Sequence, residues 1–303
     1  MQDAAVNSLI VDWGTTNFRA FQLDSDANVL GVIERPLGLL QVEQGAFAHA
    51  LENVLSDFLP DYQSIPVFMA GMVGSAKGWV NVAYVPTAAS LADLARGACE
   101  FILPWGAKAT IVPGVSCEVQ SAVFDVMRGE EIQIFGLANL VGKSEFNAMF
   151  PGTHNKHVHV VDNKIQSFAS YLSGEMFAVV SENMLLGKDL HLDELGKHNG
   201  AFLRGVDDGF ASSALSNTLF RTWTQRLFNH LDELNAADYL SGVLIGNELK
   251  QAVAAHYYLV GGASLCNRYE LACSHLGIHS TTISGNDCFL AGMAQLIQEK
   301  QNG

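Results

Sequence analysis

A stretch near the N-terminus, Asp12 followed by Gly14, Thr15, Thr16 and Asn17, combines residue types that can bind phosphate and a metal ion. The glycine lets the backbone approach a ligand closely, and the threonine hydroxyls and free amides of a turn can donate to phosphate oxygens. A carboxylate at the end of a strand can bind Mg²⁺, usually through water. An ordinary hairpin turn is the alternative interpretation.

A second glycine–threonine turn follows much later in the chain, at Gly152, Thr153, His154 and Lys156. The types Gly, Thr, Asn and Asp recur in the same order and spacing in both segments. Turns favour such residues in any case, so a coincidence and an internal duplication both remain open. If the two turns face one cleft, they can hold one triphosphate from both sides.

A third glycine-containing turn, Gly261-Gly262 with Ser264, separates a predicted buried strand from a predicted helix. Glycines allow a flat ligand to lie against the backbone, and the N-terminus of a helix is electropositive. The segment is therefore a candidate adenosine site. A plain strand-to-helix turn explains it equally well.

A possible catalytic base stands at Glu130, where Arg128-Gly129-Glu130-Glu131 opens an apolar helix. A carboxylate there can accept a proton from a substrate hydroxyl during phosphoryl transfer. The alternative interpretation is an acidic first turn that stabilises the helix dipole.

The elements that must position these residues alternate between strands and helices, which indicates an α/β fold. Short apolar runs predict strands, and apolar residues at helical spacing predict helices. The predicted strands are 8–11, 18–23, 29–33, 66–69, 110–112, 148–150, 157–161, 165–168, 258–260 and 281–283. The predicted helices are 47–58, 90–102, 175–186, 213–232, 236–256, 264–276 and 287–299.

Composition excludes several classes of protein. The 303 residues carry a net charge of −14, and no cluster of Lys and Arg offsets it, so binding of nucleic acid is not expected. Five cysteines without C-x-x-C spacing argue against a disulfide framework or a structural zinc site. No uncharged stretch is long and apolar enough for a membrane span, and residues 1–5 lack the basic region of a signal peptide. A cytoplasmic protein is expected.

Several blocks in series resemble the 2-dehydro-3-deoxygalactonokinase family of the sugar-kinase/actin/Hsp70 superfamily. The blocks are Val11–Ala20, Met69–Ser75, Gly78-Trp79, Tyr84–Pro86, Val126–Glu131, Pro151–His154 with Lys156, Ser173–Glu175, Leu240–Gly246, Ser264-Leu265, Arg268-Tyr269 and Gly285–Asp287. The resemblance implies two duplicated ribonuclease-H-like lobes with an ATP cleft between them. It suggests an N-terminal lobe at 1–120 and a C-terminal lobe at 121–303, with the last helix crossing back to the first lobe.

The resemblance also implies an activity: transfer of the γ-phosphoryl group of ATP to the 6-hydroxyl of 2-dehydro-3-deoxy-D-galactonate, with Mg²⁺, in galactonate catabolism. Related kinases carry the catalytic base in a Gly-Asp-Gln segment that opens a helix, and Gly129-Glu130-Glu131 looks like its counterpart. Glu130 is therefore the first choice for the base and Asp125 the alternative, while Asp12 is expected to position the metal.

Contacts to the sugar acid are expected from the loop at 71–86 and its neighbours. Many family members carry an Arg after the residue that corresponds to Ser75, and this chain does not. The contact to the substrate carboxylate therefore stays open, with Lys77 and Arg128 as alternatives. The full set of candidate substrate residues is Arg19, Gly71, Ser75, Lys77, Trp79 and Arg128.

Two other functions occur on the same lobes. A sugar-acid sensor of the repressor type would carry an N-terminal helix-turn-helix, for which a first strand beginning near residue 8 leaves no room. A nucleotide or polyphosphate phosphatase is the other alternative, and the expected substrate loop at 71–86 argues against it. The partners expected of a kinase are ATP and a small sugar acid, and a homodimer is one option for the assembly.

Overall fold

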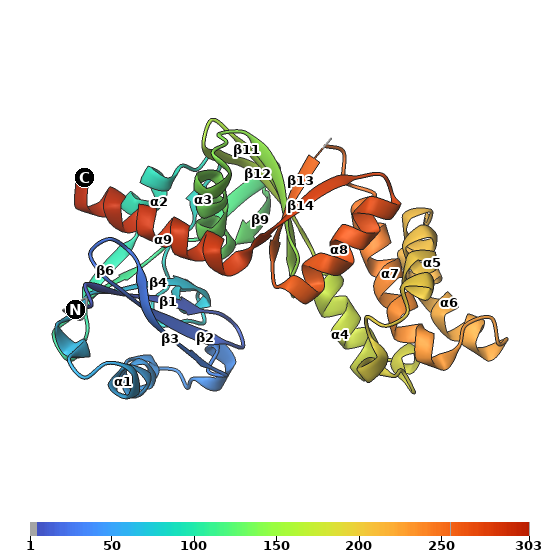
Figure 1. The fold of residues 1–303 in the computed structure, drawn as a ribbon, viewed down its shortest axis with the longest axis horizontal. Coiled ribbons are helices and arrows are strands. Elements are labelled where there is room, and N and C mark those ends of the chain that lie inside the picture. Colours follow the sequence, from blue (N-terminus) through green and yellow to red (C-terminus); the bar gives the residue numbers. More distant parts are fainter. Residues whose placement is uncertain (1–4, 255, 303) are drawn as a thin grey trace. The chain divides into compact units, whose positions relative to one another are not determined.

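A computed structural model describes residues 5–254 and 256–302, so residues 1–4, where no signal peptide is predicted, lie outside the described part. The chain forms two compact units (Figure 1). Unit 1 comprises Met1–Glu145, Val160–Phe168 and Asn286–Gly303, and unit 2 comprises Phe146–His159 and Ala169–Gly285. These bounds differ from the lobes expected at 1–120 and 121–303, and that division stays a prediction.

Unit 1 is built on a six-stranded sheet with the order β3-β2-β1-β4-β7-β6. The strands β1 (Ser8–Trp13), β2 (Phe18–Leu23) and β3 (Val29–Arg35) form an antiparallel meander, and β4 (Val67–Gly71) and β7 (Lys108–Ile111) continue parallel to β1. Helix α1 (Phe47–Phe58) packs its apolar face, which includes Leu51 and Leu55, into the same core as the inner residues of β1. The strands predicted in this region are confirmed.

Two helices of unit 1 approach each other closely. A Cβ atom at Gly136 of α3 (Glu130–Val141) would lie 1.8 Å from the carbonyl oxygen of Cys288, in α9 (Gly285–Asn302). A Cβ atom at Gly292 of α9 would lie 2.0 Å from the carbonyl oxygen of Ile132. Only glycine permits backbone contact on both sides of such a crossing, so these two positions determine where the helices meet.

Unit 1 also contains a small sheet of β5 (Val85–Pro86), β8 (Val115–Gln120) and β9 (Val123–Met127), which the sequence pattern did not predict. The predicted helix at 90–102 is wrong in its second half. Helix α2 ends at Gly97 after starting at Leu91, and Cys99–Ile102 forms the edge strand β6, which pairs with β7. Glycine ends the helix, and the following residues alternate in exposure as a strand requires.

Unit 2 contains most of a five-stranded sheet with the order β12-β11-β10-β13-β14, in which residues 160–168 are grouped with unit 1. Its strands are β10 (Phe146–Phe150), β11 (Asn155–Val161), β12 (Lys164–Tyr171), β13 (His256–Gly261) and β14 (His279–Ser284). Its helices are α4 (Ser173–Asn183), α5 (Asn199–Phe210), α6 (Leu215–Leu227), α7 (Ala236–Leu249) and α8 (Ala263–His275).

Helix boundaries in unit 2 differ from those predicted. Helix α7 ends at Leu249, whereas the sequence predicted a helix to residue 256. Residue 255 lies outside the described residues, and His256 already begins a strand. Helix α5, which packs against α7, was not predicted at all. Strands and helices nevertheless alternate as expected, and the α/β class is confirmed. In the part of the chain that the structure describes, no helix has the length and apolar character to span a bilayer.

Candidate active site

The first predicted phosphate turn connects β1 to β2 and is held by backbone hydrogen bonds. The amide of Gly14 donates to the carbonyl of Asn17 at 2.9 Å. The amides of Leu39 and Leu40 donate to the carbonyls of Gly14 and Thr15, at 2.9 and 3.3 Å. The side chains of Thr15, Thr16 and Asn17 remain exposed, so the turn is rigid and accessible from one side.

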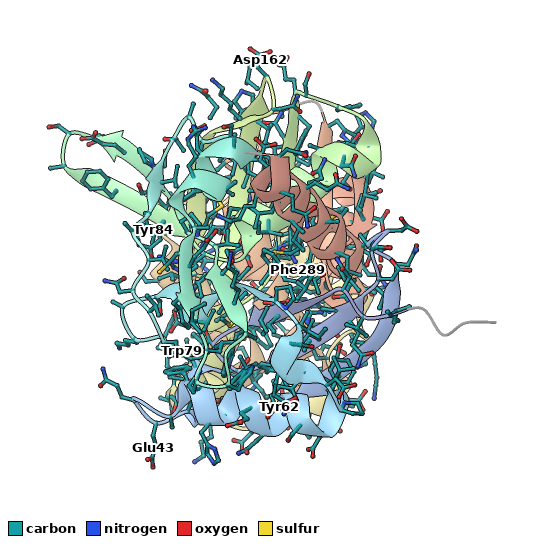
Figure 2. All side chains as sticks on the ribbon, turned by 90° about the vertical axis from the view of Figure 1, so that its left-hand side faces the viewer. Glu43, Tyr62, Trp79, Tyr84, Asp162 and Phe289 are labelled. Carbon is teal, nitrogen blue, oxygen red and sulfur yellow. The ribbon has the colours of Figure 1, made fainter. Side chains whose placement is uncertain are left out.

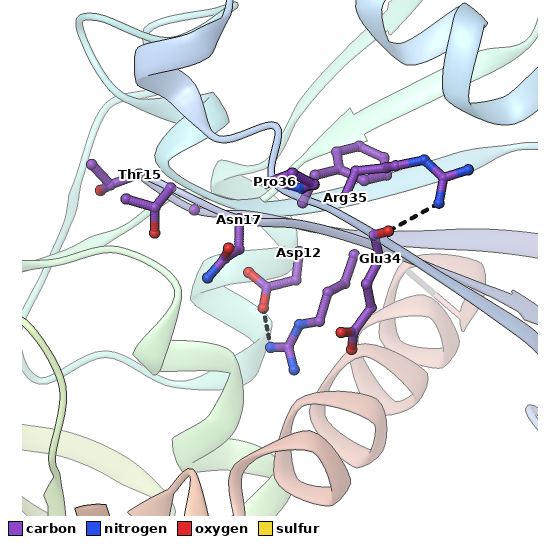
Figure 3. Close-up of a pocket in the computed structure, with 10 residues that line it drawn as sticks. Asp12, Thr15, Asn17, Glu34, Arg35 and Pro36 are labelled. Carbon is purple, nitrogen blue, oxygen red and sulfur yellow. Dashed lines mark hydrogen bonds and ion pairs between the residues drawn. The ribbon is translucent and has the colours of Figure 1, made fainter. Parts of the chain in front are cut away.

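Asp12 stands beside this turn in a row of charged residues that crosses three strands. Strand pairing aligns Asp12 with Arg19 and Arg19 with Glu34. The guanidinium of Arg19 forms an ion pair with Asp12 Oδ2 and donates to the side chain of Asn286 in α9. Asp12, Arg19, Glu34 and the turn line a cavity of about 620 Å³ (Figure 3). Arg19 therefore fixes the orientation of the Asp12 carboxylate.

Two glycines bring the N-terminus of α3 close to Asp12. Gly71 ends β4 with a φ of 95°, and a Cβ there would lie 2.7 Å from the carbonyl oxygen of Trp13 and 3.5 Å from Asp12 Oδ1. Gly129 has a φ of 110°, and its Cβ would lie 3.5 Å from the Cα of Gly71. Both positions favour glycine because other residues rarely adopt these angles. The sequence singled out Gly71 and the segment at Gly129 separately, and the structure brings them together beside Asp12.

The two glutamates that follow Gly129 have different environments. Glu131 is fully buried, and its Oε2 accepts a hydrogen bond of 2.7 Å from the amide of Gly129. Burial raises the pKa of Glu131 to about 8, with a further contribution from the charge of Glu130. Glu130 itself is half-buried in the first turn of the helix. Glu131 thus fixes the turn, and Glu130 stays closer to solvent.

Asp125, the alternative base, lies in strand β9. Its backbone pairs with Cys117 of β8, and its Oδ1 accepts a hydrogen bond of 2.8 Å from the amide of Val126. The choice between Glu130 and Asp125 remains a prediction. The contact of Gly129 with Gly71 favours the segment of Glu130.

The predicted substrate residues of the 71–86 loop differ in exposure. Lys77 is exposed, whereas Ser75 and Arg128 are buried. The ring of Trp79 packs against Phe101, with 5.2 Å between the ring centroids, at the edge of the unit 1 core. Figure 2 shows Trp79 and Tyr84 on the same side of unit 1. The roles assigned to these residues from the sequence stay predictions.

The second predicted phosphate turn, in unit 2, lies against the N-terminus of α4. A Cβ atom at Gly174 would lie 2.0 Å from the carbonyl oxygen of Gly152, and the amide of Glu175 donates to the carbonyl of Thr153 at 2.9 Å. His154 pairs with the carboxylate of Glu175 at 2.9 Å. Lys156, also expected at phosphate, is buried in β11.

A buried network that was not predicted from the sequence supports this turn. Asn155 accepts from the amide of Gly152 at 2.6 Å and donates to Oε2 of Glu248 at 2.7 Å. Glu248 also accepts from Tyr269 at 2.9 Å and pairs with His157 at 2.8 Å. The signal available in the sequence was a single acidic residue near the end of the apolar helix α7.

An apolar pocket of about 210 Å³ lies next to the second turn. Helices α4, α7 and α8 form most of its wall, and Arg268 and Ser241 add polar groups. The predicted adenosine residues lie next to this pocket in the chain. Gly262 is the N-cap of α8, and Ser264 precedes Leu265, which lines the pocket. A Cβ atom at Gly261 would lie 3.2 Å from the carbonyl oxygen of Pro151. The apolar wall of the cavity, with a few polar groups, has the character expected of a small-molecule pocket.

Comparison with known proteins shows the family of the chain. The family model described as 2-keto-3-deoxy-galactonokinase matches residues 12–296. The chain belongs to this family. A 2-dehydro-3-deoxygalactonokinase of Escherichia coli (strain K12) is 30% identical over 97% of this chain and 98% of its own length. A crystal structure of a candidate 2-dehydro-3-deoxygalactonokinase from Sinorhizobium meliloti covers 96% of this chain and 98% of its own, with 26% identity and a TM-score of 0.86.

Membership of the 2-keto-3-deoxy-galactonokinase family makes the chain a carbohydrate kinase with ATP as co-substrate and a small sugar substrate. The fold is the duplicated ribonuclease-H-like fold of sugar kinases, actin and Hsp70. A similar fold occurs in the activator of 2-hydroxyisocaproyl-CoA dehydratase from Clostridium difficile, which is 10% identical, with a TM-score of 0.53 over 97% of this chain and 96% of that one.

Proposed function

We propose that this kinase transfers the γ-phosphoryl group of ATP to the 6-hydroxyl of 2-dehydro-3-deoxy-D-galactonate. The observation that carries the proposal is the meeting of Asp12, Gly71 and the Gly129 turn, which sets a carboxylate from β1 close to the N-terminus of α3. Family membership supports the substrate. In our proposal the reaction belongs to galactonate catabolism in the cytoplasm, where the five free cysteines remain reduced.

Nucleotide binding is assigned in this proposal to both glycine–threonine turns. The amides and hydroxyls around Gly14 and Thr15 in unit 1, and around Gly152 and Thr153 in unit 2, donate to phosphate oxygens. Adenosine occupies the apolar pocket of unit 2, where Arg268 and Ser241 offer polar contacts. In this proposal Gly261 and Gly262 let the flat base lie against the backbone.

Magnesium fits the residues near the first turn. Among the described residues, no three His, Cys, Asp or Glu side chains come together as a closed metal site. Mg²⁺ in kinases commonly takes one or two protein carboxylates and fills its other positions with phosphate oxygens and water. Asp12, which Arg19 holds in place, supplies such a carboxylate. When bound, Mg²⁺ neutralises charge on the phosphate oxygens.

Glu130 acts as the general base in this proposal. Its carboxylate accepts the proton of the 6-hydroxyl while the O6–Pγ bond forms and the bond from Pγ to the β–γ bridging oxygen breaks, which releases ADP. Glu131, held by the amide of Gly129, fixes the turn from which Glu130 projects. Phosphoryl transfer depends mainly on positioning and charge, so the base has an orienting role as well.

Exchange of Glu130 for Gln tests this assignment, because the amide keeps the shape of the side chain and cannot accept the proton. We expect kcat to fall by about 10²–10⁴, with little change in the affinity for ATP. Release of ADP in the presence of 2-dehydro-3-deoxygalactonate measures turnover, and ³¹P–¹H correlation NMR locates the phosphate on C6.

Asp125→Asn is the matched control, and it is expected to retain kcat within a few-fold. If Asp125→Asn loses activity while Glu130→Gln does not, Asp125 is the base. If Glu130 only stabilises the helix dipole, Glu130→Gln will cost a few tenths of a kcal/mol in stability and almost no rate.

A further inference from the structure

Arg128 is a buried cation whose hydrogen-bonding capacity is largely unused. Its side chain is 9% exposed, and its Nη2 donates to the carbonyl of Val82 at 2.7 Å. Its Nε and Nη1 have no hydrogen-bond partner among the residues that the structure describes. Buried guanidinium groups are normally paired, because an unpaired buried charge costs several kcal/mol.

The surroundings of Arg128 hold its guanidinium in place. The group lies 4.4 Å from the centre of the ring of Tyr84, a residue labelled in Figure 2. On another side, a Cβ atom at Gly74 would lie 2.8 Å from Nη1. The Tyr84 ring is itself fixed, since a Cβ at Gly114 would lie 2.7 Å from its Cε1. The side chain is therefore positioned in advance, as a binding residue must be to save ordering entropy.

Ser75 adds a second unused donor next to Gly74. Its side chain is buried, and its Oγ has no partner within the described chain. The backbone at Ser75 is fixed by a hydrogen bond of 3.0 Å from its amide to the carbonyl of Met72. A hydroxyl from the residue after Gly74 and a guanidinium close to Gly74, both with unused donors, together suit an anion.

The neighbouring Glu131 does not neutralise this cation at neutral pH. Its burial raises its pKa to about 8, so it carries a proton at pH 7. One of its oxygens is occupied by the amide of Gly129, and Arg128 itself donates to neither oxygen. A carboxylate brought by a ligand would supply the acceptor oxygens and the negative charge that Glu131 does not provide.

We propose that Arg128 and Ser75 bind the carboxylate of the sugar acid and thereby select 2-keto acids over neutral sugars. This inference rests on the proposed function and decides between the two residues that the sequence left open. Lys77, the other candidate, is exposed and has no comparable enclosure. Charge-assisted hydrogen bonds in a desolvated site are the strongest available for a carboxylate.

The test compares two substrates and four variants of the full chain. Wild-type enzyme is assayed with 2-dehydro-3-deoxygalactonate and with its C1 carboxamide, and we expect kcat/KM to favour the acid by at least about 10². Arg128→Gln should raise the KM for the acid by about 10² and leave the KM for the carboxamide and for ATP nearly unchanged. Ser75→Ala should raise the KM for the acid about tenfold.

Arg96→Gln removes an exposed arginine of α2 and is the matched control, with kinetics expected to equal those of wild type. A KM for the acid that stays within threefold in both Arg128→Gln and Ser75→Ala overturns the inference, and so does a hundredfold rise in Lys77→Gln. If Arg128→Gln does not fold, Ser75→Ala and the wild-type preference for the acid decide the question.

A binding measurement separates this inference from the proposed function. Pyruvate carries the 2-keto carboxylate alone, and it should bind wild-type enzyme in calorimetry and bind Arg128→Gln or Ser75→Ala more weakly. Equal pyruvate binding by wild type and both variants overturns the inference even if the sugar acid is phosphorylated. Loss of pyruvate binding in the variants supports the inference even if phosphorylation occurs at another hydroxyl.

Discussion

Glu131 is a fully buried carboxylic acid at the start of α3, and its pKa of about 8 makes the stability of the fold depend on pH. The unfolded chain has the ordinary value near 4.5. Between these values the folded state holds a proton that the unfolded state releases, so this group lowers the free energy of unfolding as pH rises from about 4.5 to about 8.

We therefore predict that Glu131→Gln flattens the pH dependence of stability. Urea unfolding at pH 5 and pH 8 measures the free energy of unfolding of both proteins. Between these two pH values, the free energy of unfolding of wild type should fall further than that of the variant, by on the order of a few kcal/mol. The side-chain amide introduced by the substitution is neutral at both pH values. Its oxygen still accepts a hydrogen bond from the backbone amide of Gly129. Parallel pH profiles for the two proteins would contradict the prediction.

The residue types in the candidate site could be predicted, but their partners could not. Asp12 and Glu130 stood out in the sequence as carboxylates at element ends, and Gly71 stood out through the resemblance to the kinase family. The burial of Arg128 and the network around Glu248 depend on which side chains fold against them. Val82 lies far from Arg128 in sequence, and Asn155 lies far from Glu248, so no local pattern indicates either contact.

The β1–β2 hairpin depends on Gly38, which lies directly behind the first phosphate turn. A Cβ atom at this position would lie 2.3 Å from the backbone of Thr15 and of Thr16. We predict that Gly38→Ala displaces the turn, lowers the melting temperature and raises the KM for ATP at least tenfold, as measured by thermal unfolding and steady-state kinetics.

The control for this prediction is Gly200→Ala in helix α5, where an added Cβ atom would have nothing within 4 Å. Alanine is a better helix former than glycine, so this variant should be as stable as wild type or more so, with unchanged kinetics. Equal KM values for ATP in the two variants would show that the turn does not contact phosphate.

Strands with a strong apolar pattern were the elements easiest to predict. Strands β1, β2 and β13 have buried residues in continuous or alternating runs. The hairpin β8–β9 was missed because Val119, Val123 and Phe124 are exposed, so its apolar residues do not mark a buried face. Helix α5 was missed because its three glycines weaken the helical pattern, although two of them, Gly205 and Gly209, allow close packing on α7.

At the scale of the whole chain, the proposal divides substrate recognition between the two units. Hydrogen exchange with ADP at about 100 times its Kd should protect unit 2 at 152–155, 173–177 and 241–245 by up to about a hundredfold. The sugar acid alone should protect 74–84 and 128–131 in unit 1. If ADP slows hydrogen exchange in unit 1 only and not around the apolar pocket of unit 2, the proposed assignment of adenosine to unit 2 is contradicted.

The composition of unit 1 could not have been predicted from local sequence patterns. It takes three separate stretches of the chain, and the boundary at Glu145 falls in a short loop between α3 and β10 that resembles any other loop in the chain. The resemblance to the family suggested a last helix that crosses back, but periodicity alone does not say which core a helix joins.

The crossing of α3 and α9 at Gly136 and Gly292 also bears on how the protein is made. Strands β1–β4 and helix α3 leave the ribosome long before residues 286–302. Synthesis of unit 1 therefore begins before that of unit 2 and ends after it. Until then Phe21 and Ile132 lack neighbours such as Phe289 and Gly292. The nascent chain therefore carries an unfinished apolar surface through most of its translation, and this is the period in which chaperones have the most to bind.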